Sequence, residues 1–346
     1  MTALSADGGG GAPGNRSTPV AALAALAGGA GSRPQTLAAL VAAVRAAGPE
    51  APHSGGALPP SDLTPSGAPF EAAVVWPSGD LRVSLDPCPG APAAARRAAC
   101  LSALDAMARR ASLCRQQRTI LARVRDWQDA HPARYGAWLG LRPLGGGDAA
   151  SVRAKLYLDV PVDAPWQAFE EDLVGAPPVL PNRDIRLTMI GLDPLKGGAE
   201  LYWRCGRLYP GEIDTLLRRF RLPERGREIV AWIEALTQRS LRFELPAYDM
   251  GFSCAVDAGF VPRVFTWYAN ATSFLGPPER CRAALLRVGE AAGWPMDDYL
   301  RLTRPDARGR VPMHGLIGAI LADGAPLAAT ATVAVDAAFD GEGRHG

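Results

Sequence analysis

Arg153, Lys155 and Tyr157 alternate with two apolar residues and form the run of the chain that points most directly to chemistry. In a β-strand, alternate side chains point to the same face, so these three polar groups would stand in a row about 7 Å apart. Arginine offers a forked pair of donors, lysine a point charge and tyrosine a neutral donor, which together suit a diphosphate. The alternative is the solvated outer face of a half-buried strand. Against it, Lys155 and Lys196 are the only two lysines among 37 basic residues.

Glu71 and Arg82 form a second candidate pair. They lie on two extended segments that the turn at residues 77–80 would join into a hairpin. Both side chains could face the same side of this hairpin. The ordinary interpretation is a weak cross-strand ion pair. The functional interpretation is a carboxylate base beside a phosphate-binding arginine.

The motifs of the common phosphate and metal sites are absent from the sequence. There is no aspartate-rich motif for magnesium-bound diphosphate, no P-loop, no nucleophile elbow and no dinucleotide-binding glycine motif. The six cysteines form no CxxC pair, and the four histidines have no metal-ligand pattern around them. Phosphate chemistry in this chain would therefore depend on arginine, lysine and tyrosine, and we predict no metal ligands.

Composition restricts the class of protein. A hydrophobic fraction of 48% in 346 residues is enough for a sizeable core, and a net charge of +2 gives no support to nucleic acid or a membrane surface as a partner. We expect reduced, buried cysteines and a cytoplasmic location, since no targeting segment is evident. The expected organisation is a disordered leader at 1–33, a single domain at 34–337 and a flexible tail at 338–346.

Hydrophobic periodicity predicts hairpins separated by helices. The expected strands are 70–76, 81–85, 152–160, 185–191, 199–205, 242–245, 251–256, 263–270, 311–321 and 328–336. The expected helices are 36–47, 91–130 with one break, 166–173, 210–220, 224–239, 277–292 and 296–303. Hairpins imply antiparallel pairing, so Rossmann and TIM-barrel folds, which need single strands alternating with helices, fit the pattern poorly. About ten antiparallel strands predict an α+β fold: a closed barrel with a central chamber, surrounded by helices.

These segments resemble a known family. The run from Gly67 to Glu71, with Arg82 eleven residues later in a segment that ends in Asp86 and Pro87, resembles the opening signature of dimethylallyltryptophan-synthase-type aromatic prenyltransferases. Lys155 and Tyr157 resemble the family's first Lys-x-Tyr strand. The resemblance covers roughly residues 36–336 and implies a bacterial indole prenyltransferase with the family's ABBA barrel of ten antiparallel strands.

The resemblance implies a reaction as well. An allylic diphosphate would ionise inside the barrel while basic side chains hold the diphosphate and tyrosines shield the cation by cation–π contact. An electron-rich aromatic acceptor, usually an indole of the tryptophan type, would then attack in a Friedel-Crafts-like alkylation, assisted by a glutamate base. The family needs no cofactor, with magnesium stimulatory at most, and serves secondary metabolism such as alkaloid biosynthesis.

The implied site residues fall into three groups. Glu71 matches the catalytic base. The diphosphate ligands would be Arg82, Lys155, Arg153, Arg204 and Arg263. The residues of the cation shield and acceptor pocket would be Tyr157, Tyr202, Phe265, Tyr268, Trp203 and His314.

Two departures from the family pattern bear on function. Glu200 stands where the second basic strand usually has lysine, and a carboxylate there would repel a diphosphate unless the register or the site differs. The last hairpin has no tyrosine, which predicts room for a donor longer than five carbons. Two alternatives stay open: a non-catalytic barrel that binds a small apolar ligand, and an unrelated α+β enzyme.

Overall fold

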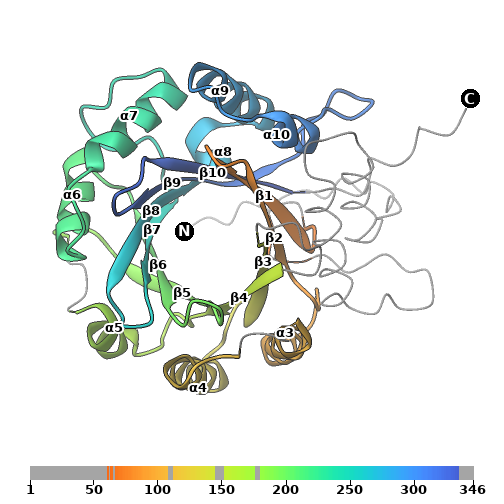
Figure 1. Cartoon of the computed structure of the whole chain (residues 1–346), viewed down its shortest axis with the longest axis vertical. Coiled ribbons are helices and arrows are strands. Elements are labelled where there is room, and N and C mark those ends of the chain that lie inside the picture. The colour runs from red at the N-terminus through yellow and green to blue at the C-terminus, as the bar shows by residue number, and fades with distance from the viewer. Residues whose placement is uncertain are drawn as a thin grey trace, which may run out of the picture.

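A closed ten-stranded antiparallel barrel forms the centre of the molecule in a computed structural model of the chain (Figure 1). The structure describes residues 61, 63–64, 67–107, 112–144, 152–175 and 180–334. The predicted leader, the first predicted helix and the tail lie outside these residues. Each strand pairs with its neighbours in sequence, and β1 pairs with β10 to close the barrel. The predicted fold class is therefore confirmed.

The strands run in alternating directions around the barrel. They are β1 (Phe70–Trp76), β2 (Asp80–Leu85), β3 (Ala137–Pro143), β4 (Val152–Asp159), β5 (Arg186–Leu192), β6 (Ala199–Gly206), β7 (Met250–Val256), β8 (Pro262–Asn270), β9 (His314–Ala322) and β10 (Ala328–Ala334). Because the strands alternate in direction, the β1–β2, β3–β4 and β5–β6 turns all lie at one end of the barrel. The starts of β1, β3, β5, β7 and β9 lie at the other end.

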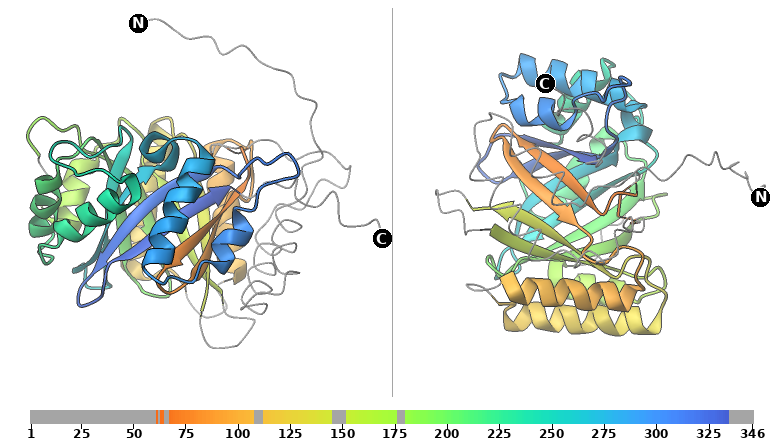
Figure 2. Two further views of the ribbon diagram at one scale, coloured as in Figure 1. Left: turned by 90° about the horizontal axis from the view of Figure 1, so that it is seen from above. Right: turned by 90° about the vertical axis from the view of Figure 1, so that its right-hand side faces the viewer.

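Eight helices in the described residues surround the barrel. They are α3 (Ala93–Met107), α4 (Arg115–Ala130), α5 (Trp166–Val174), α6 (Pro210–Arg219), α7 (Gly226–Thr237), α8 (Ala271–Leu275), α9 (Pro278–Ala291) and α10 (Asp297–Leu302). In Figure 2, α3 and α4 lie side by side along one flank of the barrel. Within the described part of the chain, no helix combines the length and the apolar character of a transmembrane span.

The two faces of each strand have different environments. On β4, Leu156 and Leu158 point toward the helices and are completely buried, whereas Lys155 and Tyr157 point inward and stay partly exposed. Period-two alternation produces this pattern, because an apolar outer face must pack under the helix layer. The partial exposure of the inward side chains shows that solvent reaches the barrel interior.

The outer face of β6, β7 and β8 forms an aromatic core. Trp203 stacks on Phe252 with ring centroids 5.1 Å apart, and Phe252 stacks on Phe265 at 5.9 Å. All three rings are fully buried beneath the helix layer, where Phe220 after α6 joins them. The prediction that Trp203 and Phe265 line the acceptor pocket is therefore wrong, because both belong to this core.

One predicted strand is replaced by another. Residues 242–245 are not a strand, and β3, which the sequence reading missed, completes the ten. Gly140 lies in the middle of β3, where glycine weakens the local pattern of a strand. A Cβ at Gly140 would come within 2.7 Å of the ring of Tyr157 on β4, so glycine lets this tyrosine lie flat over the neighbouring strand.

Candidate active site

Five basic side chains gather at the end of the barrel that carries the β1–β2, β3–β4 and β5–β6 turns. They are Arg82 on β2, Arg142 on β3, Arg153 and Lys155 on β4, and Lys196 in the β5–β6 turn. These side chains are close enough to change one another's pKa values. Burial is the largest cause that lowers the pKa values of Arg82, Arg153 and Lys196, and the neighbouring cations are the next. We call these five residues the basic cluster.

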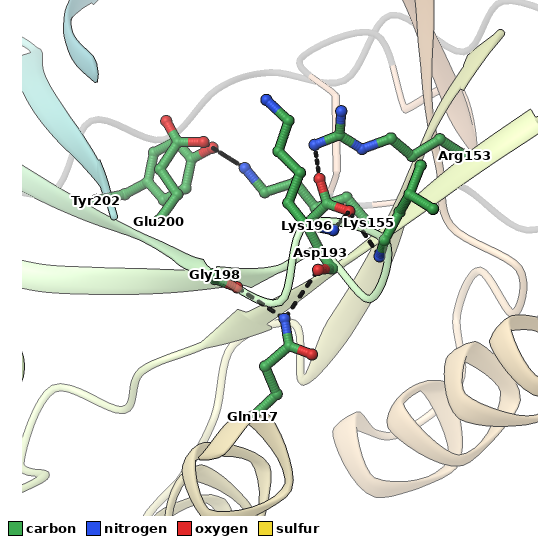
Figure 3. A network of polar contacts seen from close by, with 9 residues as sticks. Gln117, Arg153, Lys155, Asp193, Lys196, Gly198, Glu200 and Tyr202 are labelled. Atoms are coloured by element: carbon green, nitrogen blue, oxygen red, sulfur yellow. Dashed lines mark hydrogen bonds and ion pairs between the residues drawn. The ribbon is translucent and has the colours of Figure 1, made fainter. Parts of the chain in front are cut away.

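Three carboxylates face the basic cluster. Asp193 pairs with Arg153 and Glu200 pairs with Lys155 (Figure 3). Asp80 pairs with Arg142. Arg82 and Lys196 form no ion pair with any carboxylate of the described residues. Nε of Arg82 is also buried without a hydrogen-bond partner. The cluster thus keeps cationic hydrogen-bond donors available for an anion.

A buried amide on α4 fixes the turn that carries Asp193 and Lys196. Nε2 of Gln117 donates hydrogen bonds to the carbonyl of Asp193 at 2.8 Å and to that of Gly198 at 2.7 Å (Figure 3). Gln117 is completely buried. Because both acceptors are backbone groups at the two ends of the turn, the outer helix layer sets the position of this turn and of Lys196 within it.

Aromatic rings continue the interior wall beyond the basic cluster. Trp138 stacks on Tyr157 at 5.8 Å, Tyr157 meets Tyr202 at 5.9 Å, and Tyr202 meets Tyr268 at 6.3 Å. Nζ of Lys155 lies 4.9 Å from the ring centre of Tyr157 and 5.3 Å from that of Tyr202. These tyrosine faces already hold a cation, which shows that the wall can stabilise positive charge.

Glu71 lies near the opposite end of the barrel, at the start of β1. Its register partner on β2 is Ser84, and Arg82 opposes Ala73, so Glu71 and Arg82 share the inward face as predicted. They do not form an ion pair with each other. Burial raises the pKa of Glu71 to about 7, against the lowering effect of a hydrogen bond with Thr332. A carboxyl with this pKa can accept and release a proton near neutral pH.

Gly315 on β9 makes room for the Glu71 carboxyl. A Cβ at this glycine would overlap Oε1 of Glu71 and come 2.7 Å from the hydroxyl of Thr332. Sequence reasoning missed Gly315, because a glycine in this glycine-rich chain gives no signal by itself. Any larger residue at this position would displace the carboxylate.

A pocket of about 470 Å³ opens at the same end of the barrel as Glu71, beside the start of β5 and the end of β6. Its lining includes Arg183, Arg186, Arg204 and Arg207 together with Asp184 and Asp249. Nε of Arg186 and Nη2 of Arg183 are buried without hydrogen-bond partners. The pocket therefore offers both positive and negative groups to a ligand.

Three predicted site residues lie away from the basic cluster. Arg204 is paired with Asp249 at the far end of β6. Arg263 is an exposed residue at the start of β8 and is paired with Asp257 in the turn before this strand. His314 points outward and shares a hydrogen bond with Tyr299 of α10 at 2.8 Å. The assignments of Arg204 and Arg263 to the diphosphate site and of His314 to the chamber are therefore corrected.

Sequence reasoning also missed four inward-facing groups of this site: Arg142, Asp193, Lys196 and Ser253. Only Lys196 gave a usable signal, since it is one of two lysines in the chain. Arg142 was lost together with β3, and Asp193 lies in a turn whose geometry is not visible from spacing. In the described residues, no group of three or more histidine, cysteine, aspartate or glutamate side chains is arranged to hold a metal ion.

Comparison with known proteins shows that this fold is similar to that of solved prenyltransferase structures. No family model matches the sequence, and no curated protein matches it. The structure of 5-dimethylallyltryptophan synthase from Streptomyces coelicolor matches with a TM-score of 0.71 and 18% identity, covering 92% of this chain and 95% of that one. Prenyltransferase PriB matches with a TM-score of 0.71 and 18% identity, covering 91% and 94%.

A third structure, 6-dimethylallyltryptophan synthase from Micromonospora olivasterospora in complex with DMASPP and Trp, matches with a TM-score of 0.68 and 19% identity, covering 91% and 95%. At these identities the likeness concerns the fold. The chain therefore has the ABBA barrel fold of the dimethylallyltryptophan-synthase-type prenyltransferases, as the sequence resemblance implied.

Proposed function

We propose that this chain is an aromatic prenyltransferase that transfers an allylic group from its diphosphate to an indole-type acceptor. One observation carries the proposal. A single solvent-reachable barrel interior holds a basic cluster at one end, a wall of tyrosines in the middle and a carboxyl of pKa about 7 toward the other end. Glu71, Arg82, Lys155 and Tyr157 all face this interior. A barrel that only binds an apolar ligand would need no such basic lining.

The geometry assigns a role to each part. Arg82, Arg153 and Lys155, with Arg142 and Lys196, bind the donor diphosphate and stabilise the charge that develops as the C–O bond breaks. The faces of Tyr157, Tyr202 and Tyr268 shield the allylic cation. The acceptor carbon attacks this cation, and Glu71 accepts a hydrogen bond from the acceptor N–H and assists loss of the proton from the alkylated ring.

The second pocket favours a zwitterionic acceptor such as tryptophan. It lies at the Glu71 end of the barrel, so an amino acid bound there could direct its ring toward the interior. Arg186, with a buried unpaired Nε, would bind the carboxylate, and Asp249, which also pairs with Arg204, would bind the ammonium group. Arg186→Gln should therefore raise KM for tryptophan much more than KM for indole itself.

We further propose that the reaction needs no metal cofactor and that the protein acts in the cytoplasm. The five cations of the basic cluster can supply the charge stabilisation that magnesium gives in other diphosphate sites. We call the end of the barrel that carries this cluster the donor end. The six cysteines are free thiols, which fits a reducing compartment.

The test is mass spectrometry of the purified protein with tryptophan and an indole panel. Dimethylallyl, geranyl and farnesyl diphosphate are each supplied with magnesium and with EDTA. We expect a product that gains one isoprenoid unit, forms in EDTA and disappears in Lys155→Ala. Arg263→Ala is the matched control, because Arg263 is an exposed residue at the start of β8 that pairs with Asp257 and not with the basic cluster, so its loss should leave activity unchanged. Absence of product with every acceptor and donor would count against the proposal.

A further inference from the structure

Glu200 contacts the basic cluster, at the end of the barrel proposed to bind the donor, and is the feature that least suits a diphosphate site. It lies on the inward face of β6, and its carboxylate forms an ion pair with Nζ of Lys155 (Figure 3). Its second oxygen, Oε1, accepts a hydrogen bond from Oγ of Ser253 at 2.6 Å. The anomaly in the sequence is therefore real: the register is right, and the carboxylate faces the proposed donor.

Glu200 is ionised in this position. Burial acts to raise its pKa, but Lys155, Ser253 and Tyr202 together hold the pKa below its usual value. The two paired side chains are 18% and 17% exposed, so an incoming ligand can reach them. Nζ of Lys155 also donates a hydrogen bond to the hydroxyl of Tyr202 at 3.0 Å. In the structure, Lys155 is thus held by two protein acceptors, Glu200 and Tyr202.

The ion pair between Glu200 and Lys155 matters because the net charge of the donor end is small. Five cations face three carboxylates, so the donor end carries a net charge of only +2. Asp193 is fixed by the turn, since it accepts hydrogen bonds from the backbone amides of Leu195 and Lys196. Glu200 instead has no backbone tie among its hydrogen bonds in the described residues and is held only by side chains. Glu200 can therefore change its partner more easily than Asp193 can.

We propose that Glu200 is an internal competitor of the donor's diphosphate for Lys155, and so sets how tightly the donor site binds a diphosphate. This inference rests on the proposed function. When a diphosphate binds, it takes the Lys155 ammonium, and Glu200 keeps its hydrogen bond to Ser253. The competition weakens binding of any bare diphosphate, so a ligand needs its isoprenoid chain against the tyrosine wall to be held well. The same competition expels the inorganic diphosphate product.

The experiment measures binding of inorganic diphosphate and of dimethylallyl diphosphate to the full chain by calorimetry, without an acceptor. Glu200→Gln should lower the Kd for inorganic diphosphate about tenfold, because removing one partner leaves a buried cation without a counter-ion. Its gain for dimethylallyl diphosphate should be similar, while release of product diphosphate slows. Glu170→Gln is the matched control, because Glu170 is a buried carboxyl on α5 in the helix layer. It should leave both Kd values unchanged.

A double-mutant cycle assigns the effect to Lys155. In a Lys155→Gln background, Glu200→Gln should gain less than twofold, since the contested cation is gone. Ser253→Ala tests the mechanism in a chain that keeps the ion pair: Glu200 loses its second partner, and diphosphate should bind more weakly. If Glu200→Gln binds diphosphate less tightly than wild type, Glu200 orders Lys155 for the ligand and the inference is overturned.

The outcomes separate this inference from the proposed function. If the wild-type protein transfers a prenyl group but Glu200→Gln gains no affinity for inorganic diphosphate, the inference fails and the proposed function stands. If the variant gains affinity as expected but no acceptor is ever prenylated, the inference about the anion site stands and the transferase activity does not. If neither protein binds any diphosphate, both are refuted.

Discussion

The buried carboxyl of Glu71 should destabilise the folded protein when it is ionised, and it should be required for catalysis. Burial raises its pKa from a usual value of 4.5 to about 7. At about 1.4 kcal/mol for each pKa unit, this shift corresponds to about 3 kcal/mol. Because the folded-state pKa is the higher one, the folded protein binds the proton more tightly than the unfolded chain. The stabilising contribution is complete below pH 4.5 and is lost as the pH rises through 7.

Glu71→Gln should therefore be more stable than wild type at pH 8, by up to about 3 kcal/mol, and the difference should vanish toward pH 4.5. Thermal unfolding at pH 5 and pH 8 measures this directly. Glu170→Gln is a matched control for stability, since burial also raises the pKa of Glu170 to about 7, against the lowering effects of Trp203 and Arg219. Both variants should be stabilised at pH 8.

Activity should separate the two variants. Glu71→Gln should lose about 10²- to 10⁴-fold in kcat, the usual contribution of a positioned base. Glu170→Gln should keep full activity, because it lies in the helix layer. In the wild type, kcat/KM should rise about tenfold between pH 6 and pH 8 as Glu71 ionises. A flat profile over this range, or an active Glu71→Gln variant, would refute the assignment of Glu71 as the base.

Three further predictions follow from contacts around the site. Gly315→Ala should reduce kcat at least tenfold with little change in donor Kd, because the added methyl group displaces the Glu71 carboxyl and not the basic cluster; steady-state kinetics with donor calorimetry checks this. Gln117→Ala should cost about 1–3 kcal/mol in urea unfolding, since two buried carbonyls lose their donor, and should weaken diphosphate binding by loosening the β5–β6 turn. Geranyl diphosphate should be used at least as well as dimethylallyl diphosphate in direct competition, because Gly318 and Thr330 are the paired inward residues on β9 and β10 where bulkier groups would shorten the interior; a clear preference for dimethylallyl would contradict this.

Most of the barrel was predictable from local patterns. The β1–β2 hairpin and the alternation on β4 follow from turn chemistry and period-two patterning, and both appear in the structure at nearly the predicted residues. The miss at β3 has a specific cause. Gly140 weakens a strand locally but is required by the ring of Tyr157 on another strand, and such a tertiary demand leaves no local mark.

The direction in which side chains point was harder to predict than the strands themselves. In this barrel one face of each strand lines the interior and the other packs under the helices, and aromatic residues suit either face. Tyr202 and Trp203 are neighbours on β6, yet Tyr202 joins the interior wall and Trp203 joins the outer core. Residue type alone could not separate them, whereas the charged residues of β4 fixed the inward face of that strand.

Glu200 shows how a departure from a family pattern can carry more information than a match. A lysine at this position would have added a sixth cation to the donor end, and the site would have differed little from expectation. The carboxylate instead lies inward, paired with Lys155 and hydrogen-bonded to Ser253. Inward placement of a charge that opposes the proposed ligand is costly unless a partner compensates for it. Lys155 is that partner, and so the same lysine must serve both the empty and the occupied site. Donor affinity is then a difference between two ion pairs, which makes it adjustable by a single carboxylate.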